Sequence, residues 1–326
     1  MHLDAFELHQ PESLSETVRL ARTLEGRADF LAGGTDLLPN YKMHLNLRPH
    51  LIALDRVAEL GGLSLDRFGA TASLAALERL PGLARVYPGI ADAVAEVATP
   101  LVRATATVGG NLLVETRCFF FNQSHFWRQS LGYCLKADGD RCHVVPQKER
   151  CYATFSGDLA PALMVLDAEV EIAGASGIRR IPVRDLYDRN GDGIRRLTLA
   201  PGELLVAVHL PPAARQYRAS YLKLRIRPSF DFPELGVAVA ARTDGERIDD
   251  LRMAVGGLET YPRRLDELTA PLVGQNWSED RIRDLGAAVS AAVRPVRNTS
   301  LAPDYRKRMA GVYTRRAIDR MRRRDR

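Results

Sequence analysis

Four cysteines are the residues of this 326-residue chain most able to bind a metal together. They are Cys118, Cys134, Cys142 and Cys151, and fifteen, seven and eight residues separate them in turn. A cubane iron–sulfur cluster needs four thiolates but tolerates irregular spacing between them. Structural zinc sites usually use short Cys-x-x-Cys pairs, and disulfides are disfavoured in a reducing cytoplasm. Because the usual ferredoxin run of closely spaced cysteines is also absent, the residues alone leave an iron–sulfur cluster, zinc, and free or oxidised thiols as alternatives.

Two Gly-Gly segments are the second group of residues that could bind a ligand. Leu31-Ala-Gly-Gly-Thr-Asp36 places two glycines and a hydroxyl after an expected strand, and Thr105-Ala-Thr-Val-Gly-Gly-Asn111 repeats this chemistry. Backbone N–H groups in such turns can converge on an anion because no Cβ obstructs its approach. Either segment alone is more often an ordinary tight turn, but two together favour a dinucleotide. Neither contains the G-x-G-x-x-G fingerprint or the P-loop ending, which disfavours Rossmann-type nicotinamide binding and nucleotide hydrolysis.

A small unit of alternating strands and helices, residues 1–58, must position the first Gly-Gly segment. Strands are expected at 6–9, 29–32 and 50–54, and Ser13 can cap a helix after the first of them. This alternation is typical of a parallel sheet.

Two further units are expected along the chain. In residues 59–213, helices at 89–97 and 159–166 and a strand at 169–172 surround a stretch without clear periodicity, so we interpret residues of about 114–155, which hold every cysteine, as an insertion. In residues 218–326, the sequence predicts a strand at 221–224, a hairpin turn at Asp244-Gly245, and helices at about 281–293 and 304–321.

The composition indicates a globular protein, with 46% hydrophobic residues and no uninterrupted apolar run of about 18 residues. Because the first residues also lack the basic-then-apolar pattern of an export signal, we expect a cytoplasmic protein that does not span a membrane. The formal net charge of +6 arises largely from arginines between Arg315 and Arg326. No nucleic-acid-binding motif accompanies them, so we interpret this tail as a solvated helix end or a subunit contact, with no nucleic acid bound.

The order of motifs along the chain resembles the FAD-binding subunits of the xanthine oxidase family. The motifs are Ala32-Gly-Gly-Thr-Asp36, Thr107-Val-Gly-Gly-Asn111, Ser156-Gly-Asp-Leu-Ala-Pro-Ala162, Glu203-Leu-Leu205 and Lys223-Leu-Arg-Ile-Arg227 with Asp231. The resemblance covers nearly the whole chain. It implies an α+β fold, in which two α/β subdomains form the FAD-binding fold of this flavoprotein type and a C-terminal α+β domain follows. It also implies that this chain carries no catalytic residue, because the substrate is bound by a partner subunit.

The same resemblance implies which residues bind FAD. The pyrophosphate would be wrapped by the two Gly-Gly segments, through Phe30, Leu31, Ala32, Gly33, Gly34, Thr35, Asp36, Leu37, Thr107, Gly109, Gly110 and Asn111. Asp158 would hydrogen-bond the adenosine–ribityl region, Val97 and Leu205 would pack on the cofactor, and Lys223 would lie near the isoalloxazine ring. From the residues alone, Asp158 is also a candidate helix N-cap and Lys223 a candidate exposed strand lysine.

The cysteine-bearing insertion resembles more closely that of the 4-hydroxybenzoyl-CoA reductase branch of this family. That resemblance implies a 4Fe-4S cluster on Cys118, Cys134, Cys142 and Cys151, reduced by ferredoxin, in an oxidoreductase that converts 4-hydroxybenzoyl-CoA to benzoyl-CoA. Electrons would pass through FAD to 2Fe-2S clusters on a small partner subunit and to molybdopterin on a large one. The alternative is the FAD subunit of an oxidising xanthine- or CO-dehydrogenase-type enzyme, in which the cysteines bind zinc or nothing.

Overall fold

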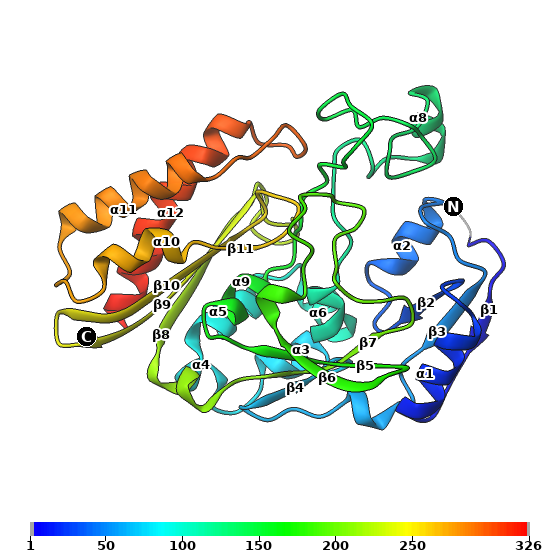
Figure 1. The fold of residues 1–326 in the computed structure, drawn as a ribbon, viewed down its shortest axis with the longest axis horizontal. Coiled ribbons are helices and arrows are strands. Elements are labelled where there is room, and N and C mark those ends of the chain that lie inside the picture. Colours follow the sequence, from blue (N-terminus) through cyan, green and yellow to red (C-terminus); the bar gives the residue numbers. More distant parts are fainter. Residues whose placement is uncertain (1–2, 325–326) are drawn as a thin grey trace.

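The computed structural model describes residues 3–324 and contains three sheets with helices packed around them (Figure 1). Met1, His2, Asp325 and Arg326 lie outside the described residues. The expected first and last units and the basic tail are therefore described without them. The strands are β1 (Glu7–His9), β2 (Ala28–Leu31), β3 (His50–Ala53), β4 (Arg67–Gly69), β5 (Glu169–Gly174), β6 (Gly177–Pro182), β7 (Leu204–His209), β8 (Arg218–Leu224), β9 (Leu235–Asp244), β10 (Arg247–Gly256) and β11 (Arg263–Arg264).

Most helices are short, and the two longest lie near the C-terminus. The α-helices are α1 (Leu14–Thr23), α2 (Leu37–Lys42), α3 (Leu74–Glu78), α4 (Leu83–Val86), α5 (Pro88–Ala95), α6 (Pro100–Thr105), α7 (Val108–Leu112), α8 (His125–Ser130), α9 (Leu159–Met164), α10 (Asp266–Thr269), α11 (Glu279–Ala292) and α12 (Pro303–Arg323). Single 3-10 turns occur at Ala58–Leu60, Val183–Asp185, Pro212–Gln216 and Ala270–Leu272.

The N-terminal sheet is parallel, with strand order β1-β3-β2, as the alternation of elements predicts. Helix α1 begins where expected, because the Ser13 hydroxyl accepts a hydrogen bond from the Glu16 N–H at 3.2 Å. Thr17 and Ala21 lie on the buried face of this helix. The sheet therefore brings the end of β2 and the first Gly-Gly segment to its carboxyl edge.

The middle sheet is antiparallel, with strand order β4-β7-β5-β6, and packs with α3 to α7 and α9 around the largest hydrophobic core. The N-terminal sheet does not have a separate core. Ile52 and Leu54, in and just after β3, share a buried cluster with Leu204 and Val206 of β7. The first two units are thus joined by packing, and the boundary near residue 58 stays a proposal.

The C-terminal sheet is antiparallel, with strand order β11-β10-β9-β8, and the expected hairpin joins β9 to β10. Gly245 in that turn has a φ of 56°, a conformation that favours glycine. Helices α11 and α12 lie along this sheet (Figure 1) and approach each other closely at Gly286 and Gly311. A Cβ on Gly286 would lie 2.8 Å from the Gly311 carbonyl oxygen, so both glycines are required by packing.

The expected insertion projects from the rest of the molecule as a lobe that contains α8 (Figure 1). Apart from α8, isolated bridges and turns make up most of residues 114–155. This irregular backbone agrees with the loss of periodicity in the sequence.

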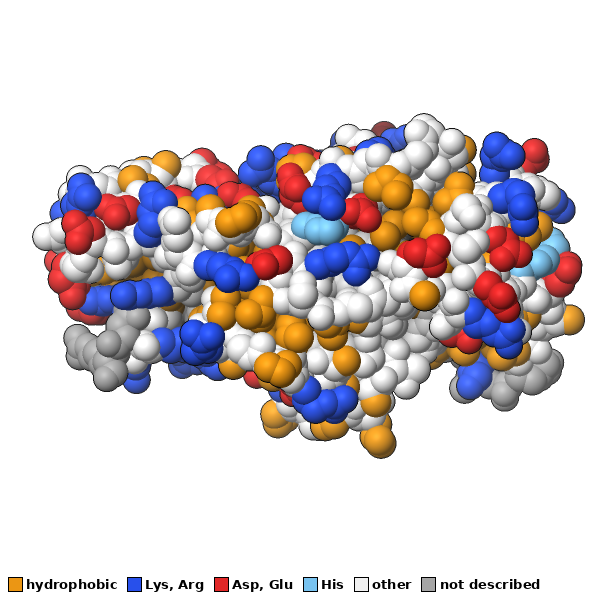
Figure 2. All heavy atoms as spheres, turned by 90° about the horizontal axis from the view of Figure 1, so that it is seen from below, with side chains coloured by type: hydrophobic (Ala, Val, Ile, Leu, Met, Phe, Trp, Pro, Cys, Tyr) orange, Lys and Arg blue, Asp and Glu red, His pale blue; other side chains and the backbone are white. Residues whose placement is uncertain are grey.

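The arginines at the end of α12 contact acidic side chains of the same chain. Arg320 and Arg324 each form an ion pair of 2.6 Å with Asp92, and Arg322 lies 3.4 Å from Glu246. On the face seen from below, basic and acidic side chains are interspersed, with hydrophobic side chains exposed between them (Figure 2). Two arginines of the tail therefore form ion pairs that hold the end of α12 against α5. No helix within residues 3–324 is long and apolar enough to cross a membrane.

Candidate functional site

The first Gly-Gly segment forms a loop of unused backbone donors directly after β2. Gly34 has a φ of 69°, which allows the successive N–H groups to turn toward one point. Within the described residues, the N–H groups of Gly33, Gly34, Thr35 and Asp36 donate no hydrogen bond. Four free donors in succession can bind an anion such as a pyrophosphate.

Gly33 also brings the two Gly-Gly segments together. A Cβ at this position would lie 2.0 Å from the Thr105 carbonyl oxygen, so the first loop rests directly on the start of the second segment. Seventy-one residues lie between these positions in the sequence, and the fold places them in contact. The expectation that the segments form one site is consistent with this geometry.

The second segment differs from the open turn that the sequence suggested, because it forms helix α7. Thr107 caps this helix, since its hydroxyl accepts from the Gly110 N–H at 3.1 Å. The Val108 and Gly109 N–H groups donate to Ala72 and Ala70 at 3.0 and 2.9 Å, and the Asn111 N–H donates to the Thr107 carbonyl at 2.9 Å. These donors are used within the protein. Gly109 is needed because a Cβ would lie 3.0 Å from Ala70.

Asn111 has a role that the sequence did not indicate. Its side-chain oxygen accepts from the Leu159 N–H at 3.0 Å, so Asn111 rather than Asp158 provides the side-chain cap of α9. Asp158 occupies the N-cap position but makes no such bond, because its carboxylate turns toward β8.

Asp158 and Lys223 form a buried ion pair. The Lys223 ammonium lies 3.0 Å from the Asp158 carboxylate, and the two side chains are 1% and 3% exposed. The Tyr221 hydroxyl donates to the other carboxylate oxygen at 2.7 Å, and Lys223 also donates to the Glu96 carbonyl at 2.9 Å. Burial raises the pKa of Asp158, while Lys223 and Tyr221 oppose that rise. The expectation of an exposed strand lysine is wrong, because Lys223 lies on the same face of β8 as Tyr221.

The remaining expected FAD residues lie near these groups or in the core beneath them. Phe30 and Ala32 pack at the edge of the cluster around α1, and Thr35 is exposed. Val97 and Leu205 are 8% and 3% exposed within the main core. Leu31 and Leu37 are partly buried on either side of the loop. Their contact with FAD stays a proposal.

Asp36 connects the first loop to the cysteine-bearing insertion. Its carboxylate pairs with the Arg117 guanidinium and accepts from the Glu115 N–H at 3.1 Å. Arg117 also donates to the side chain of Asn40 at 3.2 Å, and it directly precedes Cys118. Burial and the nearby charge of Arg196 lower the pKa of Arg117 to about 10, so Arg117 stays protonated at neutral pH. Sequence reasoning missed this connection.

The four cysteines meet in one small cavity, as their clustering in the sequence predicts. Each thiol is free, each residue is at most 7% exposed, and all four line the cavity together with Phe120, Phe121, Leu135, Lys136, His143, Val144 and Ala153. Burial raises the pKa of Cys118 to about 11 and that of Cys151 to about 12, and it also raises that of Cys134. A metal cation would be needed to hold these groups as thiolates.

A charged network closes one side of this cavity. The Lys136 ammonium, 4% exposed, donates to the Glu115 carboxylate at 2.9 Å, to the Thr116 hydroxyl at 2.8 Å and to the Gly193 carbonyl at 2.6 Å. Arg196 donates to the same Glu115 oxygen at 2.8 Å. Burial would raise the pKa of Glu115, but the charges of Arg196 and Lys136 outweigh it and lower that pKa to about 2.

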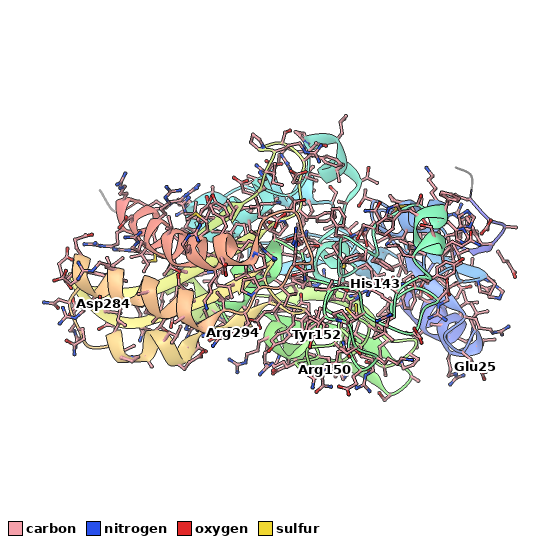
Figure 3. All side chains as sticks on the ribbon, turned by 90° about the horizontal axis from the view of Figure 1, so that it is seen from above. Glu25, His143, Arg150, Tyr152, Asp284 and Arg294 are labelled. Carbon is pink, nitrogen blue, oxygen red and sulfur yellow. The ribbon has the colours of Figure 1, made fainter. Side chains whose placement is uncertain are left out.

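Hydrogen bonds fix the insertion to both ends of the molecule. Viewed from above, its residues His143, Arg150 and Tyr152 lie between Arg294 of the C-terminal part and Glu25 of the N-terminal part (Figure 3). The Asn298 side chain donates to the Tyr152 carbonyl at 2.6 Å. On the other side, the Arg128 guanidinium donates to the Met43 and His44 carbonyls at 2.8 and 3.1 Å.

Comparison with known protein families identifies the fold that carries these features. The family model described as the FAD binding domain in molybdopterin dehydrogenase matches residues 4–213. The chain belongs to this family. A second model, the CO dehydrogenase flavoprotein C-terminal domain, matches residues 219–321, so the two models together account for all three sheets.

Individual relatives agree with this assignment. The chain is 35% identical over 284 residues to the aldehyde oxidoreductase FAD-binding subunit PaoB of Escherichia coli (strain K12), which covers 83% of this chain and 86% of the relative. It is 27% identical over 320 residues to the carbon monoxide dehydrogenase medium chain of Afipia carboxidovorans, covering 97% and 96%. A solved Cu,Mo-CO dehydrogenase structure superimposes with a TM-score of 0.77 at 25% identity, covering 98% of this chain and 99% of that one.

The expected α+β fold of the xanthine oxidase family flavoprotein type is therefore confirmed. The chain is an FAD-binding oxidoreductase subunit of the xanthine oxidase and CO dehydrogenase family of molybdenum hydroxylases. The free donors of residues 33–36 fit a bound FAD pyrophosphate, and the missing Cβ of Gly33 lets their loop rest on Thr105.

Proposed function

We propose that this chain transfers electrons through FAD in a molybdenum-dependent oxidising dehydrogenase, and that its four cysteines hold an iron–sulfur cluster. The observation that carries the cluster is that four buried free thiols meet in one cavity. This cavity lies beside the residues that connect to residues 33–36, which we call the FAD loop. The Cys118 backbone follows directly on Arg117, which binds Asp36 of that loop. FAD at the loop and a cluster at the cysteines would therefore be held by adjoining segments of the chain.

The spacing of the thiols supports a cluster over a single zinc ion. Four thiolates around zinc at about 2.3 Å would lie roughly 3.8 Å from one another. Within residues 3–324, no three of the cysteine sulfurs lie within 4.8 Å of one another. A cubane cluster holds its thiolates further apart, because each binds a different iron. The cysteine sulfurs are therefore spaced more widely than in a zinc tetrahedron.

The residues of this chain bind and orient these groups, and none of them reacts with substrate. The N–H groups of residues 33–36 would hold the pyrophosphate, and the Asp158–Lys223 pair fixes the neighbouring ends of α9 and β8. Phe120, Phe121 and Val144 exclude water from the thiols. Bound FAD would supply reversible two-electron chemistry, and a cluster would supply one-electron transfer.

Partner subunits complete the proposal. PaoB and the Afipia carboxidovorans protein are named as a subunit and a medium chain, which supports assembly with a molybdopterin-binding large subunit and a 2Fe-2S small subunit. On the insertion, Phe119 is 54% exposed and Phe126 is 80% exposed, and such aromatic side chains are typical of surfaces that a partner covers. Failure of the purified chain to bind both partner subunits in a pull-down would contradict this.

The names of the relatives favour an oxidising reaction, and aldehydes are the substrate class to test first. A second candidate is reductive dehydroxylation of 4-hydroxybenzoyl-CoA with reduced ferredoxin, which the four-cysteine insertion favours by its resemblance to that branch. The assembled complex should be assayed for aldehyde oxidation with an artificial electron acceptor, and separately for ferredoxin-dependent formation of benzoyl-CoA. Turnover in the second assay alone would replace the oxidising proposal by the reductive one.

The cluster itself is tested by changing Cys134 to Ser. Serine is a poorer ligand for iron than a thiolate, so iron bound to this chain should fall well below the wild-type content while FAD stays bound. The measurement is iron, zinc and flavin per chain, with a visible absorption spectrum. Ser130→Ala, in α8 of the same insertion, is the matched control and should keep both groups. Zinc in place of iron in the anaerobically purified wild type, or unchanged iron in the Cys134→Ser protein, would refute the cluster.

A further inference from the structure

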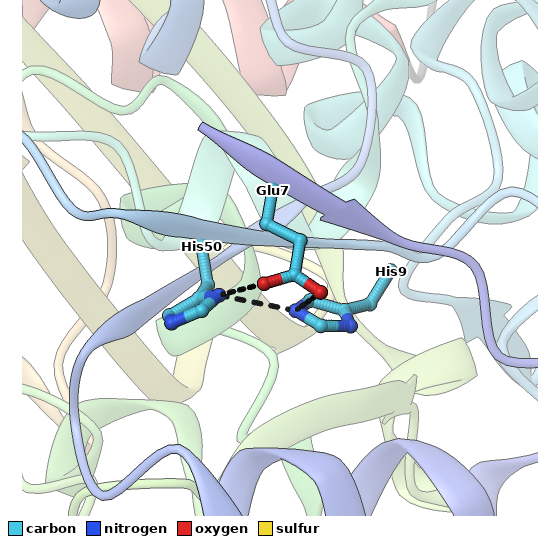
Figure 4. Close-up of side chains that lie close together, drawn as sticks. All are labelled: Glu7, His9 and His50. Atoms are coloured by element: carbon cyan, nitrogen blue, oxygen red, sulfur yellow. Dashed lines mark hydrogen bonds and ion pairs between the residues drawn. The ribbon is translucent and has the colours of Figure 1, made fainter. Parts of the chain in front are cut away.

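Two histidines and a glutamate converge at the start of the N-terminal sheet, far from the cysteines in the sequence. Glu7 and His9 belong to β1, His50 begins β3, and Glu7 is the register partner of His50. Because alternate residues of a strand share a face, Glu7 and His9 point to the same side. Figure 4 shows the three side chains leaving the strands together and meeting at their tips.

The distances between the three candidate ligand atoms are close to the ligand–ligand distance in a tetrahedral metal site. His9 Nε2 lies 3.2 Å from His50 Nδ1, Glu7 Oε2 lies 3.2 Å from His50 Nδ1, and Glu7 Oε1 lies 3.8 Å from His9 Nε2. A tetrahedral zinc ion with ligands at about 2.0–2.1 Å separates them by roughly 3.3–3.4 Å. One ligand atom from each residue lies within 4.8 Å of the other two, and no other trio among residues 3–324 meets that condition.

We propose that Glu7, His9 and His50 form a binding site for a divalent transition-metal ion of the zinc class. Two imidazoles and one carboxylate are a ligand set that zinc accepts in three-ligand sites, where water or another group takes the fourth position. The two histidine side chains are 19% and 17% exposed, whereas Glu7 is 64% exposed. The imidazoles are thus held in place by packing, and solvent reaches the site from the glutamate side.

The position of the site indicates a structural role. In a parallel sheet all strands run in one direction. Glu7 and His50 lie where β1 and β3 begin, and His9 ends the three-residue β1, whereas the free N–H groups of residues 33–36 follow the end of β2. Two of the three ligands would thus place the metal toward the end of the sheet opposite the FAD loop. It would fasten β1, an edge strand of three residues, to the central strand β3.

The test is zinc binding by the full-length chain and its variants. Wild type, Glu7→Gln, His50→Ala and His44→Ala are compared by calorimetric titration with Zn²⁺ and by melting temperature with and without Zn²⁺. His44→Ala is the matched control, because His44 lies in the same unit and pairs with Asp4 at 3.0 Å but contributes to no three-residue site. All four proteins keep the same cysteines, so zinc taken up by the thiols is common to them and cancels in the comparison.

Wild type and His44→Ala should each bind one more Zn²⁺ than His50→Ala, and that ion should raise the melting temperature. Loss of one ligand should weaken its binding by about 100-fold or more, since even second-shell partners account for 10–100-fold. Glu7→Gln keeps the shape of the side chain, so it separates loss of a ligand from loss of folding. FAD content should be unchanged in every variant. Equal zinc stoichiometry in all four proteins, or wild-type binding of the extra ion only at millimolar zinc, would overturn the proposal.

Discussion

Replacing Glu115 by glutamine should destabilise the chain strongly at neutral pH, because it neutralises the anion that two buried cations share. Lys136 and Arg196 lie 2.9 and 2.8 Å from one Glu115 oxygen, and their side chains are 4% and 18% exposed. Glutamine has the same shape but no charge. The pKa of Glu115 is lowered from its ordinary value of 4.5 to about 2, which corresponds to a differential interaction of about 3 kcal/mol. Breaking a buried ion pair from one side typically costs about 3–5 kcal/mol, in agreement with that value.

The pH dependence distinguishes this explanation from a loss of packing. The folded pKa lies below the unfolded one, so the stabilisation is complete well above pH 4.5 and is lost as the pH falls toward 2. From these two values, wild type should lose about 1 kcal/mol of this contribution by pH 4 and about 2 kcal/mol by pH 3. The glutamine variant has no such group to titrate. The difference between the two proteins should therefore narrow from about 3 kcal/mol at pH 7 to about 1 kcal/mol at pH 3.

The assay is the urea midpoint of the FAD-loaded chain, followed by circular dichroism between pH 7 and pH 3. Asp140→Asn is the matched control, because the Asp140–Lys148 pair lies in the same insertion but both side chains are more than 70% exposed. That variant should keep the wild-type midpoint at neutral pH. A Glu115→Gln penalty that stays constant across the pH range would refute the electrostatic reasoning, as would a penalty below about 1 kcal/mol at pH 7.

Two further predictions concern the FAD loop and the buried ion pair. Gly33→Ala should lose FAD, because the added Cβ would lie 2.0 Å from the Thr105 carbonyl oxygen. Gly26→Asn should keep FAD, because Gly26 lies at a left-handed turn where a Cβ would meet no atom within 4 Å. The flavin absorbance of each purified protein measures the bound FAD. Lys223→Met should destabilise the chain by about 3–5 kcal/mol by leaving Asp158 buried without a cation. The double variant with Asp158→Asn should recover part of that loss, and additive losses in thermal unfolding would argue against the pairing.

The sequence predicted the fold where local signals and packing agree. Ser13 begins α1 as expected, and Asp244-Gly245 turns the hairpin, because a cap and a tight turn depend on residues only a few positions apart. The second Gly-Gly segment was predicted less well. Its helix α7 depends on carbonyl groups of Ala70 and Ala72, which no pattern near residue 109 reveals.

The site was predicted where several residues of one kind fall close together in the sequence, and missed where the partners are distant. The cysteines are clustered in the sequence and lie around one cavity. Lys223 and Asp158 are distant in the sequence, and only the fold brings them into contact. The two-residue spacing of Tyr221 and Lys223 on β8 did indicate that both side chains face the same way. His9 and His50 are 41 residues apart and meet only because β1 pairs with β3.

Asp36 shows how the FAD loop and the cysteine cavity depend on each other. A carboxylate next to a pyrophosphate is unfavourable unless its charge is neutralised, and Arg117 neutralises it here. The Asp36 N–H therefore remains free for the anion while its carboxylate binds the insertion. Cys118, the first thiol of the cavity, follows Arg117 directly. This ion pair therefore couples the position of the FAD loop to that of the cysteine cavity.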